Sequence, residues 1–392
     1  MKIRVVKIVP NEFKNESRDL RELSVLKSLG CDISVVAKEG CDEDYGYKCI
    51  RLSTRPISKF IKNPLINRVI SVIFWTKTVK SLSPHIISCH DLISLLIGWL
   101  SNVSSFNKSK LIYDSHEFEY ARDESRGKFT LFCIKHLERF LIKRCAFSIM
   151  VNDSIADEVV KLHHLKERPV VARNFPYRWP IDEQEIANKR KAFIKNNGLP
   201  EKAKIVIYQG ALSKRRGIEN AIRAISLIEG SVYLLIIGSG QPSYVESLRK
   251  LANDLSIAKR VIFHPAIQYS ELWKYTGMAD VGLCILENVC MNHYLALPNK
   301  FSEYIQSLVP IVSNNFPELV RIIDKYKVGR YCEADNPNSL ASVIMEMTLR
   351  NEEMATYKKY LIVAKEELCW EKEKRNIVNA YVNLVSELKG LK

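Results

Sequence analysis

The sequence lacks the features that mark a membrane-spanning or secreted chain. Its longest apolar runs, over residues 69–75 and 91–100, fall far below the roughly 20 residues that a helix needs to cross a bilayer. The first ten residues enter a strand-like pattern at once, without the apolar stretch and small-residue cleavage site of a signal peptide. We therefore expect a cytoplasmic protein with no transmembrane segment.

Paired cysteines and the common phosphate-binding loops are also missing. The ten cysteines stand singly with no C-x-x-C pair, which argues against a zinc or redox site and predicts reduced thiols in the cytosol. No G-x-G-x-x-G or Walker A sequence occurs, so a dinucleotide or P-loop site has little support. Because no D-x-D sequence stands at a plausible strand end, we expect no essential metal.

What the sequence has in excess is positive charge. It contains 59 Lys and Arg against 44 Asp and Glu, a formal net charge of +15. Residues 1–178 hold 30 Lys and Arg and 20 Asp and Glu, so the difference of +10 lies in the first half. This excess implies an anionic partner: nucleic acid, an acidic membrane surface or a phosphorylated substrate. Charge alone does not choose among them.

Both halves of the chain alternate β-branched runs with amphipathic stretches, which predicts βαβ units and parallel sheets. A length of 392 residues suits two such domains. The expected strands of the first half are 3–9, 32–37, 48–53, 85–89, 110–115, 147–151 and 169–174. Those of the second half are 203–209, 231–237, 260–263, 280–285, 310–313 and 329–332. Residues 175–201, which begin with FPYRWP and continue Lys-rich, are interpreted as the interdomain linker and the entry to the second domain.

The strongest local signal is LPNKFSEYI over residues 297–305, followed by LVPIVS over residues 308–313. Pro298 precedes a helical pattern, and the amide groups and dipole at a helix N-terminus favour an anion such as a diphosphate. Lys300 adds a cation, and Glu303 lies about one turn into the helix, where its carboxylate could bind the hydroxyls of a ribose. The competing interpretation is a solvated glutamate that only stabilises the first turn.

Two glycine-containing segments follow expected strands in the same half. In YQGALSKRRGIE (208–219), Gly210 would let a ligand approach the backbone, and Lys214 begins a run of three cations. In LIIGSG (235–240), a buried strand ends in a turn at Gly238. The competing interpretations are a solvated surface loop for the first and an ordinary α/β turn for the second.

Together these segments resemble the donor-binding signature of the family 4 glycosyltransferases, in its variant form PNK-x-x-E-Y followed by x-P-[IV]-V-S. The resemblance implies a GT-B fold: two Rossmann-like domains that face each other across a cleft, and a C-terminal helix that crosses back to the N-terminal domain. It assigns residues 1–178 to acceptor binding, residues 179–370 to donor binding and residues 371–392 to the return helix. The expected donor-binding residues are Gly210, Lys214, Arg216, Gly238, Asn299, Lys300, Ser302 and Glu303.

The chain departs from the family pattern at two positions. Many members carry a sugar-binding glutamate eight residues before the ribose-binding one, where this chain has Leu295, so the candidates for sugar recognition are Asn292, His293 and Tyr294. Many members also carry an arginine directly after the first glycine of the diphosphate loop, where this chain has Ala211.

In the first half, the sequence YDSHE places His116 and Glu117 after an expected strand, at the edge of the predicted cleft. By resemblance we expect His116 to be a catalytic-site residue supported by Glu117, although a histidine that only satisfies loop carbonyls fits too. Arg18 is placed on the acceptor side. Residues 55–80 mix basic and apolar side chains, which fits equally a segment on an anionic membrane surface and a core-facing helix.

The function implied by the resemblance is retaining transfer of a hexose from a nucleoside diphosphate sugar to an acceptor hydroxyl. The acceptor would be a glycan or a lipid-linked glycan in cell-surface polysaccharide synthesis, reached at the inner face of the membrane, with no cofactor. One alternative is a nucleotide-sugar 2-epimerase on the same scaffold, against which the PNK segment and the basic first half argue. Another is a degenerate, non-catalytic or anion-binding protein; no nucleic-acid-binding motif is present.

Overall fold

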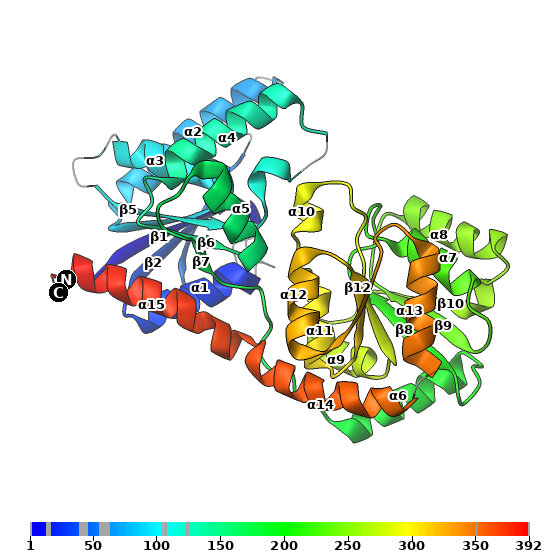
Figure 1. Ribbon diagram of the computed structural model, residues 1–392. Coiled ribbons are helices and arrows are strands. Elements are labelled where there is room, and N and C mark those ends of the chain that lie inside the picture. The colour runs from blue at the N-terminus through cyan, green and yellow to red at the C-terminus, as the bar shows by residue number, and fades with distance from the viewer. Residues whose placement is uncertain are drawn as a thin grey trace. The chain divides into compact units, whose positions relative to one another are not determined.

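Two parallel sheets, each covered by helices, make up the computed structural model of the chain (Figure 1). It describes residues 2–12, 17–38, 46–54, 63–103, 105, 108–122, 125–349 and 351–390. The chain divides into two units: unit 1 comprises residues 1–173 and 374–392, and unit 2 comprises residues 174–373.

The sheet of unit 1 has the strand order β3-β2-β1-β4-β5-β6-β7, and every neighbouring pair is parallel. Its central strands carry apolar side chains on both faces, as expected of a sheet covered on both sides. The strands are β1 (Arg4–Glu12), β2 (Asp32–Lys38), β3 (Lys48–Arg51), β4 (Ile86–His90), β5 (Lys110–Ser115), β6 (Phe147–Met150) and β7 (Val170–Val171).

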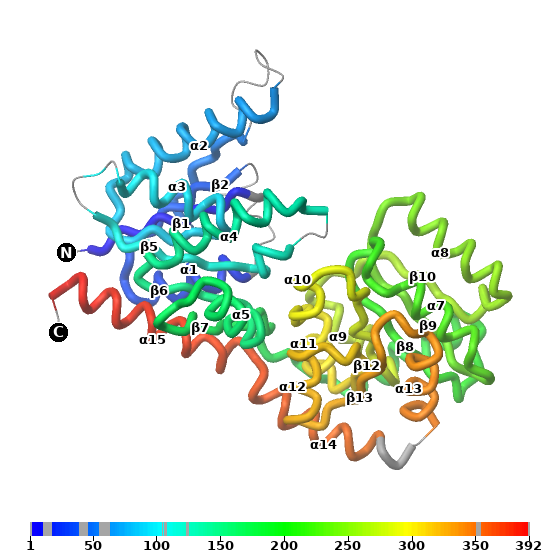
Figure 2. Tube along the Cα trace, turned by 45° about the horizontal axis from the view of Figure 1, so that its top comes forward, coloured from blue at the N-terminus to red at the C-terminus, as the bar shows by residue number. Residues whose placement is uncertain are grey.

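Helices cover both faces of this sheet. Figures 1 and 2 show α2, α3 and α4 along one face, and α1 and the C-terminal helix along the other. Two helices begin at asparagine caps, whose side-chain oxygens accept bonds from Leu65 N and Ile155 N. The helices are α1 (Ser17–Ser28), α2 (Pro64–Ser81), α3 (Asp91–Val103), η3 (Glu119–Ala121), α4 (Lys128–Ile142) and α5 (Asp153–His163). Within the described residues, no helix has the length and apolar character needed to cross a membrane.

The sheet of unit 2 has the order β10-β9-β8-β11-β12-β13, again parallel throughout. The strands are β8 (Lys204–Gln209), β9 (Val232–Ile237), β10 (Val261–His264), β11 (Val281–Cys284), β12 (Ile311–Asn314) and β13 (Gly329–Cys332). The helices are α6 (Glu183–Asn196), α7 (Ile218–Ser226), α8 (Pro242–Asp254), η4 (Ala258–Arg260), α9 (Tyr269–Gly277), α10 (Met291–Tyr294), α11 (Asn299–Gln306), α12 (Pro317–Tyr326), α13 (Pro337–Leu349) and α14 (Asn351–Glu367).

Two apolar clusters sandwich this second sheet. One joins its strands to α7, α8 and α13, and the other joins them to α6, α11, α12 and α14. Each expected strand forms within a few residues of its predicted ends. The prediction of two α/β domains with parallel sheets is confirmed.

The interpretation of residues 175–201 as the entry to the second domain is confirmed, but their interpretation as a linker is wrong. Phe175 is 1% exposed and Phe193, on α6, is 7% exposed, and both lie in the apolar core of unit 2. Arg190 of α6 donates to the Ala203 carbonyl and pairs with Asp280 at 2.9 Å. The sequence did not indicate this packing, because most side chains of the segment are polar and only a few anchor it to the core. The boundary between the units falls earlier, after residue 173.

The C-terminal helix α15 (Trp370–Leu388) begins in unit 2 and continues in unit 1. At its start, Trp370 N donates to the Pro176 carbonyl at 2.8 Å. Further along, the buried Tyr381 hydroxyl donates to the carboxylate of Glu22 on α1, and its ring meets Phe147 edge-on at 5.3 Å. The helix is thus held to unit 1 by both an apolar and a charged contact.

The expectation of reduced thiols throughout is wrong at one position. Eight of the described cysteines are free, but Cys49 on β3 is disulfide-bonded. Bridging depends on how close two Cβ atoms come in space, which the isolated spacing of cysteines along a chain does not reveal. The cysteines therefore no longer support a cytosolic location.

Replacing Tyr381 by Phe should destabilise unit 1. The change removes the hydrogen bond to a buried carboxylate while keeping the ring contacts, so the free energy of unfolding should fall by about 1–3 kcal/mol. Urea unfolding measures the loss. Tyr360→Phe, on the exposed side of α14, is the matched control and should leave stability unchanged. Equal stability of the two variants would show that the Glu22 contact contributes nothing.

Candidate donor-binding and catalytic sites

Two glycine turns pack against each other where β8 and β9 end. Gly210 N donates to the Ile237 carbonyl at 3.0 Å, and Leu212 N donates to the Ser239 carbonyl at 2.8 Å. A Cβ atom on Gly238 would lie 1.9 Å from the Gly210 carbonyl oxygen, and the φ angle of Gly238 is 158°. Only glycine fits there, so the two turns approach each other with no side chain between their backbones.

Lys300, in the first turn of α11, is a buried cation without a hydrogen-bonding partner. Lys300 is 7% exposed, and no described residue accepts a hydrogen bond from its Nζ atom. The ammonium lies 3.5 Å from the centre of the Tyr208 ring, and its Cε atom lies 3.7 Å from where a Cβ on Gly210 would stand. Burial, helped by the charge of Arg216, lowers the pKa of Lys300 to about 7.

Glu303 lies one turn further along α11 and is held in place. Its Oε2 atom accepts a hydrogen bond from Gln209 Nε2 at 2.6 Å, and Gln209 Oε1 in turn accepts from the Thr276 hydroxyl at 2.7 Å. Burial raises the pKa of Glu303, while the Gln209 bond and the Lys300 charge act in the opposite direction. Sequence reasoning missed Gln209; its signal is a polar residue at the end of a buried strand, just before a glycine.

The remaining predicted donor residues lie nearby in sequence but differ in exposure. Lys214 is exposed and Arg216 is half-buried in the loop between β8 and α7. Asn299 opens α11 and accepts a hydrogen bond from the Asn174 side chain at 3.0 Å. Ser302 is 2% exposed and donates to the Asn299 carbonyl at 2.8 Å, so its hydroxyl is already used inside the helix.

The candidates for sugar recognition form the short helix α10 and its end. His293 Nδ1 lies 2.9 Å from the Glu287 carbonyl oxygen, and the Tyr294 ring meets Phe316 edge-on at 5.4 Å. Asn292 is half-buried. Leu295 is 4% exposed and lies in the apolar interior, so this position does not present a polar group to a ligand.

In unit 1, a buried ammonium stands among three buried carboxylates. Lys7 Nζ lies 2.9 Å from Asp19, 2.5 Å from Glu22 and 3.4 Å from Asp114, and all four side chains are at most 2% exposed. Burial alone would lower the pKa of Lys7, but the carboxylates outweigh it and raise that pKa well above its usual value. Asp19 and Asp114 keep a pKa below the ordinary range, because the cations and imidazoles around them outweigh their burial.

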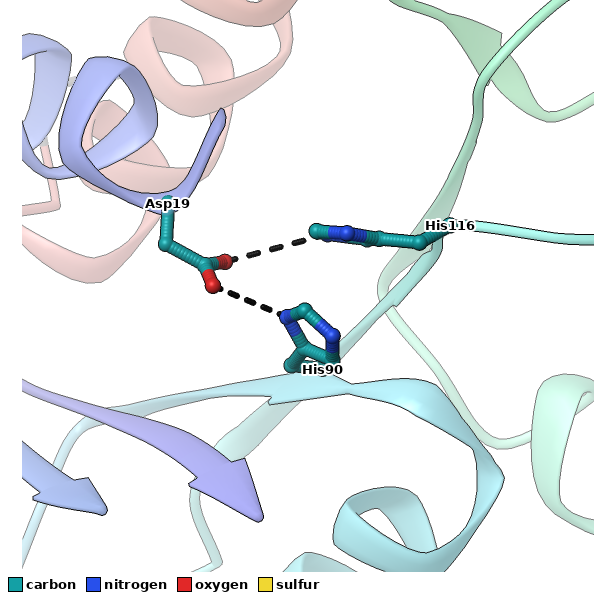
Figure 3. Close-up of side chains that lie close together, drawn as sticks. All are labelled: Asp19, His90 and His116. Atoms are coloured by element: carbon teal, nitrogen blue, oxygen red, sulfur yellow. Dashed lines mark hydrogen bonds and ion pairs between the residues drawn. The ribbon is translucent and has the colours of Figure 1, made fainter. Parts of the chain in front are cut away.

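Two histidines border this network (Figure 3). Asp19 Oδ2 lies 2.9 Å from Nδ1 of His90, which ends β4, and Asp19 Oδ1 lies 3.8 Å from Nε2 of His116, which follows β5. His116 Nε2 is also 3.2 Å from Asp114, and the two imidazole rings are 3.7 Å apart. The hydrogen bond to Asp19 outweighs burial and raises the pKa of His90.

His116 is the member of this network that reaches solvent. Its side chain is 17% exposed, against 3% for His90. The three buried carboxylates face two cations, Lys7 and the buried Arg18, and a fourth carboxylate, that of Asp91, lies 3.5 Å from His90 Nε2. His116 is therefore the part of this charged network that a ligand could contact.

The other two predicted residues of unit 1 have different surroundings from those expected. Arg18 lies inside the first turn of α1 and is 4% exposed; its guanidinium donates to Asp114 at 2.7 Å and to the Ala172 carbonyl. It therefore orients the carboxylate next to His116. Glu117 is 40% exposed and pairs with Arg122.

Two groups of side chains in the described part of the chain bring three possible metal ligands together, and both include Asp19. The groups are Asp19 with His90 and His116, and Asp19 with Glu22 and Asp114. The Lys7 ammonium already lies 2.9 Å from Asp19, so a lysine supplies the positive charge that a metal ion would bring.

Part of the chain matches a known protein family. Residues 189–362 match the family model described as Glycosyl transferases group 1. An uncharacterised glycosyltransferase of Methanocaldococcus jannaschii is 23% identical over 323 residues, which cover 78% of this chain and 76% of that protein.

Solved structures share the fold over the whole chain. A sucrose-phosphate synthase from Thermosynechococcus elongatus is 17% identical with a TM-score of 0.76, and both chains are covered in full. Anabaena HepE in complex with UDP is 13% identical with a TM-score of 0.74, again with both chains covered in full. HepE is also known in complex with UDP-glucose.

The fold of two Rossmann-like units is therefore that of the GT-B glycosyltransferases. The protein is a glycosyltransferase, and residues 189–362, which include the glycine turns, Lys300 and Glu303, form its group 1 domain.

Replacing Gly238 by Ala should disturb this edge of unit 2. The new Cβ would meet the Gly210 carbonyl at 1.9 Å and force the turns apart, so we expect the melting temperature to fall by about 5 °C or more. Gly230→Ala is the control, because Gly230 also has a positive φ but no atom within 4 Å of the added Cβ. If both variants melted alike, backbone strain rather than the contact between the turns would explain the loss.

Proposed function

We propose that the protein is a retaining, family 4 glycosyltransferase that moves a hexose from a nucleoside diphosphate sugar to an acceptor hydroxyl. The observation that carries the proposal is the pair formed by Lys300 and Glu303 on one turn of α11. A buried ammonium without a hydrogen-bonding partner is unfavourable unless an anion completes it. A diphosphate is such an anion, and the complexes of HepE with UDP and UDP-glucose support this choice.

Each group of the site has a part in this proposal. The N-terminus of α11 and Lys300 bind the diphosphate, and Arg216 and Lys214 add positive charge from the neighbouring loop. The glycine turns at Gly210 and Gly238 let the phosphates approach the backbone. Glu303, oriented by Gln209, accepts the ribose hydroxyls.

The reaction breaks the bond between the anomeric carbon and the diphosphate oxygen, and the diphosphate leaves with the electron pair. The acceptor oxygen forms the new bond to the same face of that carbon and releases its proton. The cations stabilise the negative charge that grows on the leaving group, as donors do in an oxyanion hole. No cofactor takes part, and these side chains supply the charge that a metal ion would otherwise bring.

We assign His116 a catalytic role on the side of the sugar and acceptor. Its exposed edge lies next to the Asp114 carboxylate, and an imidazole can both donate and accept hydrogen bonds, which suits it to interact with a hydroxyl group. Asp19, His90 and Asp114 would position the ring rather than touch substrate. Asn292, His293 and Tyr294 remain our candidates for sugar recognition.

We further propose that the acceptor is a glycan or a lipid-linked glycan of the cell surface, and that the enzyme works in the cytoplasm at the inner face of the membrane. The support is the positive charge of residues 1–178, where 30 Lys and Arg stand against 20 Asp and Glu. No nucleic-acid partner is part of the proposal.

Nucleoside diphosphates should stabilise the protein against heat through Glu303. At about 100 times its dissociation constant, the correct nucleotide should add roughly 2.7 kcal/mol to the free energy of unfolding. The measurement is the melting temperature with the diphosphates UDP, GDP, ADP or dTDP, and with the monophosphate CMP. Glu303→Gln should lose most of the shift, because the amide removes the charge and one acceptor for the ribose.

Glu246→Gln, on the exposed side of α8, is the matched control and should keep the full shift. A shift with none of the nucleotides, or an equal shift in Glu303→Gln, would contradict the proposed donor site.

Nucleotide affinity should fall with rising pH because of Lys300. In the free protein its pKa is about 7, and a bound diphosphate would raise that pKa by stabilising the ammonium. Above pH 7 binding must therefore take up a proton, and affinity should fall by up to about tenfold per pH unit. Calorimetry with UDP between pH 7 and 9 measures this.

Lys300→Arg is the control, because a guanidinium stays protonated over the whole range and should remove the slope. A flat profile for the unchanged protein would show that Lys300 does not bind the diphosphate.

A further inference from the structure

Helices α2 and α4 of unit 1 expose large apolar side chains that the described part of the fold does not cover. Four of them are at least 60% exposed: Phe129 at 80%, Leu65 at 67%, and Val69 and Phe132 at 60%. The set comprises Leu65, Ile66, Val69, Ile73 and Phe74 on α2, and Phe129, Phe132 and Phe140 on α4. We call these eight side chains the α2–α4 surface. Exposed apolar patches of this size usually mark an interaction site.

The orientation of α2 is the reverse of what folding of an isolated domain would favour. The helix turns Asn67 and Ser71 inward, at 1% and 9% exposure, while Val69 and Phe74 point out at 60% and 54%. The inner face is held by the Trp75 indole, which donates to the Ser53 carbonyl at 3.2 Å. The inward Asn67 and Ser71 side chains donate to the Asn63 and Ser53 carbonyls, so they are satisfied within the fold. The outward apolar side chains gain nothing from the fold, so their stabilisation must come from elsewhere.

The charges around this surface have one sign. Helix α2 carries Arg68, Lys77 and Lys80 and no acidic residue. Helix α4 carries Lys128, Lys135 and Arg139, and its one acidic residue, Glu138, is 1% exposed and bonded to Tyr113 and His163. Lys143 and Arg144, exposed, follow directly. The two helices therefore present apolar groups and cations without an exposed carboxylate.

The two helices belong to one layer. Both contact α3, and Figures 1 and 2 show all three over the same face of the unit 1 sheet. Trp99 of α3 and Phe140 of α4 meet edge-on with ring centres 5.2 Å apart. Because each helix turns its buried side toward the sheet, the exposed side chains point away from it together. Such a layer can contact one extended partner surface.

We propose that the α2–α4 surface docks on an anionic lipid membrane. The aromatic and aliphatic side chains would enter the boundary between headgroups and acyl chains, and the lysines and arginines would meet the lipid phosphates. Apolar side chains flanked by cations of one sign are complementary to this partner. The inference rests on the proposed function in one respect: membrane docking would bring a lipid-linked acceptor to the enzyme.

This surface settles one alternative left open by the sequence. Residues 55–62 lie outside the described residues, but over 64–81 the helix is not simply a core helix with a solvated basic side. Its inner face is partly polar and its outer face is apolar. The sequence alone could not show which face of the helix is buried, because apolar residues recur at helical spacing on both faces.

Vesicle flotation with the full chain tests the proposal. The probes are vesicles of neutral phosphatidylcholine and vesicles that also contain phosphatidylglycerol, each at low and at high salt. The unchanged protein should float with the anionic vesicles and much less with the neutral ones. Phe129→Ser/Phe132→Ser should lower the partition coefficient at least about tenfold, because two buried aromatic contacts are lost. Lys128→Glu/Lys135→Glu should lower it only for anionic vesicles.

The matched control is Ile362→Ser/Val363→Ser on α14, which removes two apolar side chains of similar exposure in unit 2. It should float like the unchanged protein. All variants change exposed positions, and retained circular dichroism would confirm that each is folded.

Three results would overturn the proposal. The first is no flotation of the unchanged protein with anionic vesicles, and the second is equal flotation of the Phe129→Ser/Phe132→Ser variant. The third is a dimer, seen by ultracentrifugation without lipid, that this variant abolishes; the surface would then join two copies of the chain. Flotation needs no nucleotide or turnover, so its result is independent of whether the donor site proposal holds.

Discussion

Unit 1 depends on one buried ion cluster, in which the ammonium of Lys7 is surrounded by the carboxylates of Asp19, Glu22 and Asp114. Removing any one partner would leave an uncompensated charge in the interior, so these groups act as a set. The cluster joins β1, α1 and β5, and through Glu22 it also holds Tyr381 of the C-terminal helix. Its outer members orient the two histidines, so the same interaction stabilises the unit and shapes its candidate catalytic edge.

Two lysines are buried among the described residues, and they differ in whether the fold supplies a partner for the ammonium. Lys7 has three carboxylate partners, which keep its pKa well above the usual value. Lys300 has an aromatic ring beside it and no hydrogen-bonding partner among the described residues, and burial brings its pKa to about 7. The first lysine is complete within the fold, whereas the second is stabilised fully only by an anionic ligand. This difference supports a donor site in unit 2.

Both sites lie at the carboxyl ends of parallel strands, where this architecture leaves room for ligands. Glycine turns after β8 and β9 pack backbone against backbone there, and α11 brings its N-terminus and Glu303 to the same edge. In unit 1, His90 and His116 follow β4 and β5, which are neighbours in the sheet. The α2–α4 surface is the outer side of helices that cover this sheet, so acceptor chemistry and membrane contact would occupy one unit.

The sequence by itself determined the local elements: the periodicity of β-branched runs places every strand, and Pro298 marks the start of α11. It also marked Lys300 and Glu303, because their signal is a short contiguous motif. Only the tertiary structure brought Asp19 to His90 and His116, set Gln209 against Glu303, gave Arg18 to Asp114 and anchored α6 through Phe193. These contacts join residues far apart in the chain, and local periodicity carries no information about which distant side chains meet. Packing also determined which face of α2 is exposed, because the hydrogen bond from the Trp75 indole to the Ser53 carbonyl holds the opposite face inward.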